Sequence, residues 1–217
     1  MPIVRFVSAS VFSLSLLAAA CDKKEAPPVE LAPATSAGLE APKPASEKST
    51  TVVVDAPSSS VKFLMDSPLE KIDGDAPGSA SGELAIDLED LSKSNGLFKV
   101  DLDKLTLYQQ KRDDEGQAYG ERKKSDKQNE HARDWFQIVP REGETTPEQA
   151  AANRMVEFRV EKVESEVKNV LSLSGPERKV PATISGTLRL HGRQAPKSVK
   201  AELTFRFAGD KLESVGV

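Results

Sequence analysis

The chain has 217 residues, with 30 lysines and arginines against 34 aspartates and glutamates, and a net charge of −4 at pH 7. This slightly acidic balance gives no general electrostatic basis for binding nucleic acid, so we expect no nucleic-acid partner. The single cysteine, Cys21, excludes an internal disulfide and a cysteine-based zinc cluster, and two histidines leave little scope for a multi-histidine metal site. We therefore expect no metal and no cofactor.

Residues 1–20 have the pattern of an export signal. Arg5 precedes an apolar run of 15 residues, Phe6–Ala20, which is shorter than the roughly 20 residues of a membrane-spanning helix. Small residues end the run before Cys21, and charged residues follow directly. This arrangement resembles a bacterial lipoprotein signal, which implies cleavage before Cys21, acylation of its thiol and a membrane-anchored protein of the cell envelope that faces the periplasm. An ordinary signal peptide or a short anchor is the alternative.

Residues 21–50 form a second region, dominated by alanine, proline, glutamate, lysine and serine, without an aromatic residue. Such a composition buries too little apolar surface to offset the entropy lost on ordering. It also lacks the periodic apolar stripe of an amphipathic helix that lies on a membrane. We therefore predict a disordered stalk between the acylated Cys21 and a folded domain that begins at Thr51.

Alternation with a period of two begins at Thr51 and indicates β-strands over most of the remaining chain. It is clearest in two neighbouring segments, Val180–Gly192 and Val199–Phe207, where apolar and polar residues alternate. The stretch His191–Pro196 between them is rich in turn-forming residues. We therefore predict a long antiparallel hairpin with its turn at 191–196.

The same alternation predicts further strands. Met155–Val163 has one apolar face, and Leu97–Leu107 changes parity near Asp103, which predicts a β-bulge there. Shorter strands are expected at Val52–Val54, Val61–Met65, Glu83–Leu88 and Leu212–Val217. Lys127–Phe136 does not alternate and favours one short helix. Around eight strands with one apolar face each predict an all-β, antiparallel sandwich or closed barrel over residues 51–217.

Two motifs carry a family resemblance. The hairpin segment Gly186–Pro196 reads G-x-L-x-L-H-G-x-x-x-P, and His131–Phe136 reads H-x-x-x-x-F. With the order of the other segments from Thr51 to Phe207, they resemble the YceI-like family of polyisoprenoid-binding proteins of the bacterial envelope. The resemblance implies a lipocalin-like barrel of about eight strands. Two polar stretches, Lys111–Lys127 and Arg141–Asn153, depart from the family and are expected at the barrel mouth.

The expected inward-facing residues are almost all apolar, and such a lumen attracts a long apolar tail. The resemblance implies that this tail belongs to an isoprenoid-like lipid, such as a quinone or a polyprenyl lipid. Equally, a barrel of this size can be filled by its own side chains. The candidate lining residues are Phe63, Ile86, Phe98, Val100, Trp135, Phe136, Phe158, Ile184, Leu188, Leu203 and Phe205.

Polar candidates for a ligand head group are few. His131 could donate to one, but on a helix Asn129 and Arg133 share a face from which His131 points away. The helix is therefore expected to pack over one barrel end, and His191 to face solvent. The chain has no G-x-S-x-G, S-x-x-K, H-E-x-x-H or phosphate-loop motif, so we expect no enzyme.

Two functions follow from these predictions. The first is a membrane-tethered lipoprotein that carries or stores an isoprenoid-like or other long-chain amphiphilic lipid inside the barrel. The alternative is a packed-barrel envelope protein whose charged loops, Lys111–Lys127 and Arg141–Asn153, bind a protein partner and no lipid. The sequence leaves open which membrane holds the protein and whether two domains form a homodimer through exposed strand edges.

Overall fold

The computed structural model describes residues 37–217, which contain the whole predicted barrel domain and the last part of the predicted stalk. The predicted export signal and Cys21 lie outside the described residues. About half of the described chain, 49%, is β-strand and every strand pairing is antiparallel, which confirms the predicted fold class. None of the helices within residues 37–217 is long and apolar enough to cross a membrane.

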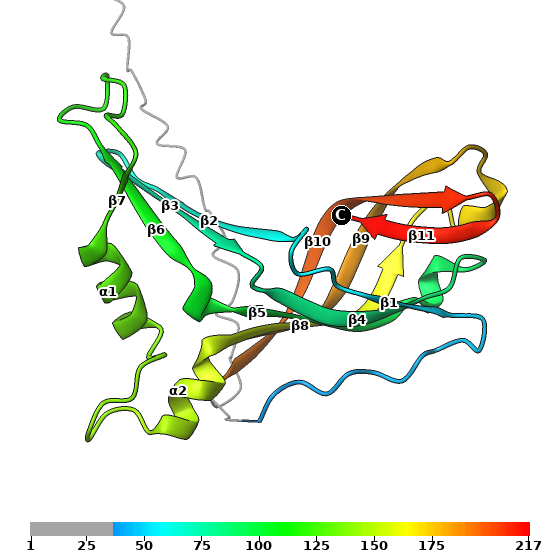
Figure 1. The fold of residues 1–217 in the computed structure, drawn as a ribbon, viewed down its shortest axis with the longest axis horizontal. Helices are drawn as coiled ribbons and strands as arrows, with labels where there is room; N and C mark the ends of the chain where they lie inside the picture. Colours follow the sequence, from blue (N-terminus) through cyan, green and yellow to red (C-terminus); the bar gives the residue numbers. More distant parts are fainter. Residues whose placement is uncertain (1–36) are drawn as a thin grey trace, which may run out of the picture. The chain divides into compact units, whose positions relative to one another are not determined.

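Seven strands form one sheet that curls into a nearly closed barrel (Figure 1). In spatial order they are β1 (Thr50–Val53), β4 (Ala80–Ile86), β5 (Asn95–Asp101), β8 (Met155–Glu164), β9 (Glu177–Leu190), β10 (Arg193–Ala208) and β11 (Lys211–Gly216). The barrel therefore has seven strands rather than the eight expected. The difference arises because some of the alternating segments pair in a separate sheet.

That second sheet has four strands: β2 (Ser60–Asp66), β3 (Glu70–Pro77), β6 (Thr106–Lys111) and β7 (Lys123–Lys124), with the order β2-β3-β6-β7. The chain passes between the two sheets four times, and two of these connections are short joints. β3 leads into β4 through Gly78, whose φ of 62° is the left-handed conformation that glycine adopts without strain. β5 leads into β6 through a single 3-10 turn, η2 (Leu102–Lys104), which lies where the sequence predicts a bulge.

The predicted hairpin is present as β9 and β10, but its turn is shorter than 191–196. Leu190 pairs with Arg193, so only His191 and Gly192 form the turn. Both have positive φ, 52° and 69°, which is the conformation of a two-residue type I′ turn. Pro196 lies inside β10 opposite Thr187. It is tolerated there because β11 pairs with β10 only from Thr204 onward, so the other edge of β10 is open at Pro196.

The described chain contains two α-helices, not the single helix expected. The predicted one is α1 (Asp126–Trp135), capped by Ser125, whose hydroxyl accepts from the Gln128 N–H at 3.2 Å. The second, α2 (Pro147–Arg154), lies in the polar stretch predicted as a loop. Its signal was present in the sequence: Thr146 and Gln149 form a capping box around Pro147, the first residue of the helix.

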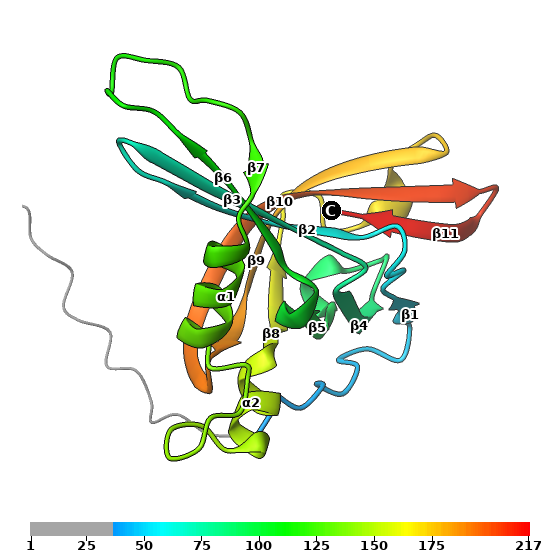
Figure 2. The same cartoon turned by 60° about the vertical axis from the view of Figure 1, so that its left-hand side comes forward.

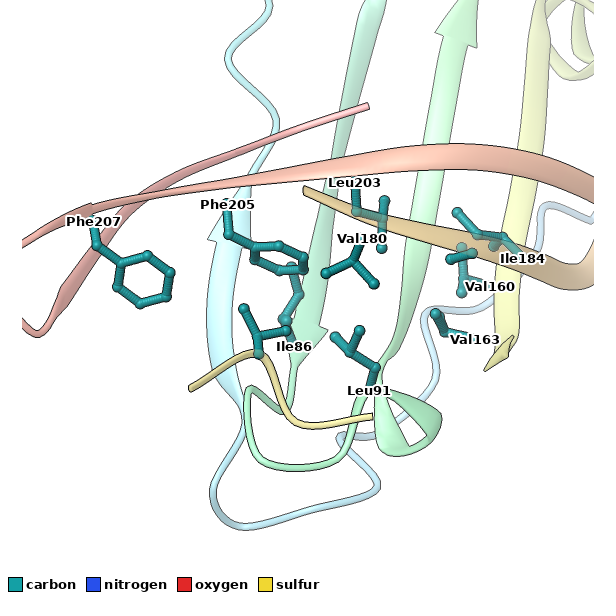
Figure 3. Close-up of a cluster of buried hydrophobic side chains, with 11 residues drawn as sticks. Ile86, Leu91, Val160, Val163, Val180, Ile184, Leu203, Phe205 and Phe207 are labelled. Carbon is teal, nitrogen blue, oxygen red and sulfur yellow. The ribbon is translucent and has the colours of Figure 1, made fainter. Parts of the chain in front are cut away.

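Apolar side chains from most strands of the barrel meet in one buried cluster. In Figure 3, Ile86, Val180 and Leu203 lie close together on different strands of the barrel, and Leu91 joins them from the 3-10 turn η1 (Leu91–Lys93). Val170, Val180 and Phe205 are completely buried. Full burial of one such side chain contributes about 1.5–3 kcal/mol, so this cluster is the main source of the stability of the barrel.

The last part of the predicted stalk packs against the barrel and corrects that prediction. Leu39 is only 6% exposed, and its N–H donates to Glu157 Oε2 at 2.7 Å. Asn95 Nδ2 donates to the Lys43 carbonyl at 2.8 Å. These contacts offset the entropy of ordering the chain, so the folded region begins before Leu39 rather than at Thr51.

Candidate functional site

The interior of the barrel, where the sequence places a lipid, holds a cavity of about 40 Å³. Five of the eleven predicted lining residues border it: Ile86, Phe98, Ile184, Leu203 and Phe205. Ligand pockets usually have about 300–1,000 Å³, whereas one water molecule in the liquid occupies about 30 Å³. The lumen is therefore filled by side chains of the protein itself in this conformation.

Eight further residues border the cavity, and the sequence analysis did not name them as lining. They are Leu84, Leu91, Ser94, Asn95, Val160, Val163, Val215 and Val217. Leu84 has the parity of Ile86 and could have been found from it. Val160 and Val163 both face inward because the register of β8 shifts between Val160 and Lys162, which simple alternation does not predict.

The two polar residues at the cavity differ in how they are satisfied. Ser94 Oγ accepts from the Asp87 N–H at 3.0 Å. Asn95 is 9% exposed, and its Oδ1 has no hydrogen-bond partner among the described residues. A buried acceptor of this kind is normally paired with a donor, so Asn95 Oδ1 is an exception among the described residues.

The other six predicted residues lie away from the cavity. Three are half-buried residues of the barrel strands: Val100, Phe158 and Leu188. Phe136 packs with Leu107 and Ala132 between α1 and the four-stranded sheet. Trp135, on α1, is 69% exposed, and Phe63, on β2, is 38% exposed. Phe63 was thus expected in the barrel but lies in the four-stranded sheet, whereas Trp135 and Phe136, expected near the barrel mouth, lie at the end of α1.

The polar candidates on α1 hold the helix in place. Asn129 Oδ1 accepts from the Leu107 N–H at 2.8 Å, and its Nδ2 donates to the Leu107 carbonyl at 2.9 Å, so one side chain fastens α1 to β6. Arg133 Nη1 contacts Asp103 Oδ1 at 2.6 Å. The ring of His131 lies 5.7 Å from that of Trp135. These residues do not converge on one head-group site.

A buried row of charges crosses the outer face of the barrel, and sequence reasoning missed it. Glu157 is 3% exposed and Arg189 is 1% exposed, although both occupy polar-face positions of their strands. Glu157 Oε1 lies 3.2 Å from Lys99 Nζ, and Glu157 Oε2 lies 3.5 Å from Arg189 Nη1. Arg189 Nη1 also donates to the Ala152 carbonyl of α2 at 3.1 Å. Since Leu39 binds the same carboxylate, this row fixes the N-terminal segment to the barrel.

Within the stretch Lys111–Lys127, Arg122 forms ion pairs with the four-stranded sheet, while most of the other charged residues are exposed. Arg122 Nη2 lies 2.7 Å from Asp75 Oδ2, and its Nε lies 2.7 Å from Asp73 Oδ2. The hydrogen bond that Arg122 donates to Asp73 is the main reason why the pKa of Arg122 is raised. The guanidinium also stacks on the ring of Tyr108 at 3.6 Å. In Figures 1 and 2 the β6–β7 connection lies beside the β2–β3 turn, where Tyr119 Oη donates to the Ser67 carbonyl at 2.6 Å.

The stretch Arg141–Asn153 is also internally paired. Arg141 forms ion pairs with Asp134 and Glu144, and Thr145 is buried. In each stretch an arginine is paired with carboxylates of the domain, while most of the other charged side chains remain exposed.

Exposed apolar side chains gather on β2 and the turn that follows it. Phe63, Leu64, Met65 and Leu69 are 38%, 62%, 43% and 49% exposed. β2 is an end strand of its sheet and pairs only with β3 among the described strands. α1 packs over β6, and β3 lies between β6 and β2. Three consecutive apolar residues are thus exposed on an open strand edge.

Within residues 37–217, no group of three or more histidine, cysteine, aspartate or glutamate side chains could hold a metal ion. No protein-family model, no curated protein and no solved structure matches the chain. Membership of the YceI-like family therefore stays a prediction from the motifs.

Proposed function

We propose that this protein is a membrane-tethered binding protein of the bacterial cell envelope, in which the barrel is a scaffold and the edge of β2 binds a protein strand. The exposure of Phe63, Leu64 and Met65 on an end strand supports this proposal. Proteins normally protect such edges, and an unprotected one is a template for another strand. Main-chain hydrogen bonds then provide affinity, and the side chains provide specificity.

The tether is part of the proposal and rests on the sequence around Cys21. Acylation of Cys21 would hold the domain at the membrane surface through residues 22–36. The buried contact of Leu39 with Glu157 fixes the point at which the chain leaves the barrel. Metabolic labelling with a fatty acid tests this part, because a Cys21→Ser variant is expected to lose the label.

Cross-linking in the cells that produce the protein tests the proposed surface. A photo-reactive side chain at Leu64, which is 62% exposed, is expected to capture a protein strand. The same group at Val199, which is 48% exposed on β10, is the matched control. Equal capture at the two positions, or none at Leu64, would contradict the proposal.

A second candidate is the lipid carrier implied by the family resemblance. Two observations favour it: eleven of the thirteen residues at the cavity are apolar, and Asn95 Oδ1 is a buried acceptor without a partner among the described residues. Because Val215 and Val217 border the cavity, a lipid tail would enter by displacing the end strand β11.

Mass spectrometry of lipids that copurify with the full chain distinguishes this candidate from a filled barrel. Stoichiometric lipid that is lost in a folded Phe98→Glu variant supports carriage. A lipid-free protein recovered from its own membranes rejects it. Circular dichroism must show that the Phe98→Glu variant is folded, since Phe98 also packs against the core.

A further inference from the structure

The backbone of β2 shows which of its residues are available for pairing. At its two ends, the Ser67 N–H donates to the Glu70 carbonyl at 2.9 Å, and the Gly78 N–H donates to the Ser59 carbonyl at 3.3 Å. In an antiparallel pair, hydrogen-bonded positions alternate along each strand. The odd-numbered residues of β2 therefore bond to β3. The N–H and C=O groups of Ser60, Lys62, Leu64 and Asp66 point to the open edge.

These residues are complementary to themselves when a second β2 runs antiparallel across a two-fold axis at Leu64. Leu64 then faces Leu64 of the other copy. Lys62 faces Asp66, and the symmetry repeats this pair on the other side of the axis. Opposite charges at facing positions stabilise a strand pair, whereas like charges destabilise it.

The opposite face of the same pairing is apolar. Phe63 faces Met65 of the other copy twice, and a sulfur beside an aromatic ring is a favourable contact. A two-fold axis at Phe63 also satisfies the backbone but places Lys62 opposite Leu64 and Ser60 opposite Asp66. Only the axis at Leu64 places both charged residues of β2, Lys62 and Asp66, opposite a residue of opposite charge.

The open part of β10 provides an internal contrast. From Arg193 to Leu203 this strand also has one edge without a partner strand among the described residues. It carries Pro196, Lys197 and Lys200, and prolines and lysines are residues that block pairing between sheet edges. β2 has one lysine, Lys62, and no proline. The opposite charge, that of Asp66, lies on the same strand.

We propose that the occupant of the β2 edge is a second copy of this chain, paired antiparallel with Leu64 opposite Leu64. The two four-stranded sheets then join into one continuous sheet around a symmetric, isologous interface. This inference rests on the proposed function of the edge and names its partner. The existing contact of Asp66 is compatible with it: Tyr119 Oη donates to Asp66 Oδ1 at 3.0 Å, and a carboxylate can accept several further hydrogen bonds.

Cysteine cross-linking of the full chain in its own cells tests the register. Facing hydrogen-bonded residues have Cα atoms about 5.5 Å apart, within the range of a disulfide, so a Leu64→Cys variant is expected to form a covalent dimer on mild oxidation. A mixture of Phe63→Cys and Met65→Cys chains is expected to cross-link to each other more than either does to itself. The parent chain, whose only cysteine is Cys21, is the control.

Charge reversal tests the complementarity in the Leu64→Cys background. Lys62→Asp or Asp66→Lys places like charges opposite each other twice and is expected to lower dimer formation about tenfold. The double variant restores both pairs with their signs exchanged and is expected to recover dimer formation. Lys197→Asp on β10 is the matched control and is expected to have no effect.

The outcomes separate this inference from the proposed function. Cross-linking of Leu64→Cys to a different protein, with no dimer, would overturn the second copy but retain the edge as a binding surface. An absence of every adduct at Leu64 would overturn both. Dimers that form equally well in the single charge reversals would overturn the register.

Discussion

The barrel and the four-stranded sheet are built from the same kind of alternating sequence but differ in how far their apolar faces are buried. In the barrel, apolar side chains meet others across the lumen, and Phe205 and Val180 are completely buried. In the four-stranded sheet, Ala132 of α1 packs with Ile72 and Leu107, whereas Phe63 is 38% exposed. Alternation thus specifies which face is apolar, whereas the tertiary arrangement decides whether that face is covered.

Truncation of a phenylalanine in each region should show this contrast most strongly. We expect Phe205→Ala to lower the free energy of unfolding by about 4 kcal/mol, because it leaves a cavity in a closed core. Phe63→Ala should lower it by less than about 1 kcal/mol, since a half-exposed side chain loses little buried area. Urea unfolding followed by far-UV circular dichroism measures both. Equal losses would mean that the sheet is as well packed as the barrel.

The fold was predictable from the sequence to the extent that it depends on local pattern. Alternation located the hairpin of β9 and β10 and the parity change at η2. It did not predict β3, and it could not show that β2 and β6 pair outside the barrel, because the sheets separate only through pairing between residues far apart in sequence. The capping residues around Pro147 are a local signal for α2, but the polar composition of that stretch led to the prediction of a loop.

Removal of one member of the buried charge row is the next largest effect. Arg189→Met should lower the free energy of unfolding by about 3 kcal/mol, because Glu157 keeps a buried charge with one cation fewer. The N-terminal segment should also become more sensitive to proteases near Leu39, which binds the same carboxylate. Limited proteolysis with mass spectrometry measures the second effect.

A paired substitution controls for a general loss of packing. Adding Glu157→Leu to Arg189→Met removes both charges and should recover part of the lost stability. Protease sensitivity near Leu39 should persist in this double variant, since the acceptor for the Leu39 N–H is absent. If the double variant is less stable than Arg189→Met alone, the charge row is not the source of the effect.

The site residues were less predictable than the fold, for a physical reason. Ile86 and Phe205 were found because inward positions of a barrel strand serve equally as core and as lining. Glu157 and Arg189 were missed because their burial depends on α2 and on residues 37–39, which cover a face that alternation assigns to solvent. The local sequence of β8 and β9 does not indicate that segments far away in the chain cover Glu157 and Arg189.

Attachment of α1 to the four-stranded sheet depends on one amide. Asn129→Ala removes both hydrogen bonds to the backbone of Leu107 and should lower stability by about 1–2 kcal/mol. Hydrogen exchange should rise in α1 and β6 while the barrel strands stay protected. Glu130→Ala, on the exposed side of the same helix, should change neither. Uniform exchange across both sheets would show that they unfold as one unit.

The smallest effect concerns the joint between the two regions. Asp101, at the end of β5, caps η2 and binds Arg154 with Nε–Oδ1 and Nη2–Oδ2 distances of 2.6 and 2.5 Å. The hydrogen bond from Arg154 is the main reason why the pKa of Asp101 is lowered. A lowered pKa in the folded state stabilises the protein above the pKa of the unfolded chain, near 3.9, and this contribution is lost as the pH falls through the folded pKa.

Arg154→Gln should therefore lower stability at pH 7 by about 0.5–1 kcal/mol, with the stabilities of the variant and the parent protein converging below about pH 3. Lys162→Gln, which removes an exposed ion pair with Glu164, should leave the change of stability with pH in this range the same as in the parent protein. If the stability of Arg154→Gln changes with pH in parallel with that of the parent protein, the joint is held by the turn itself and not by the ion pair of Asp101 with Arg154.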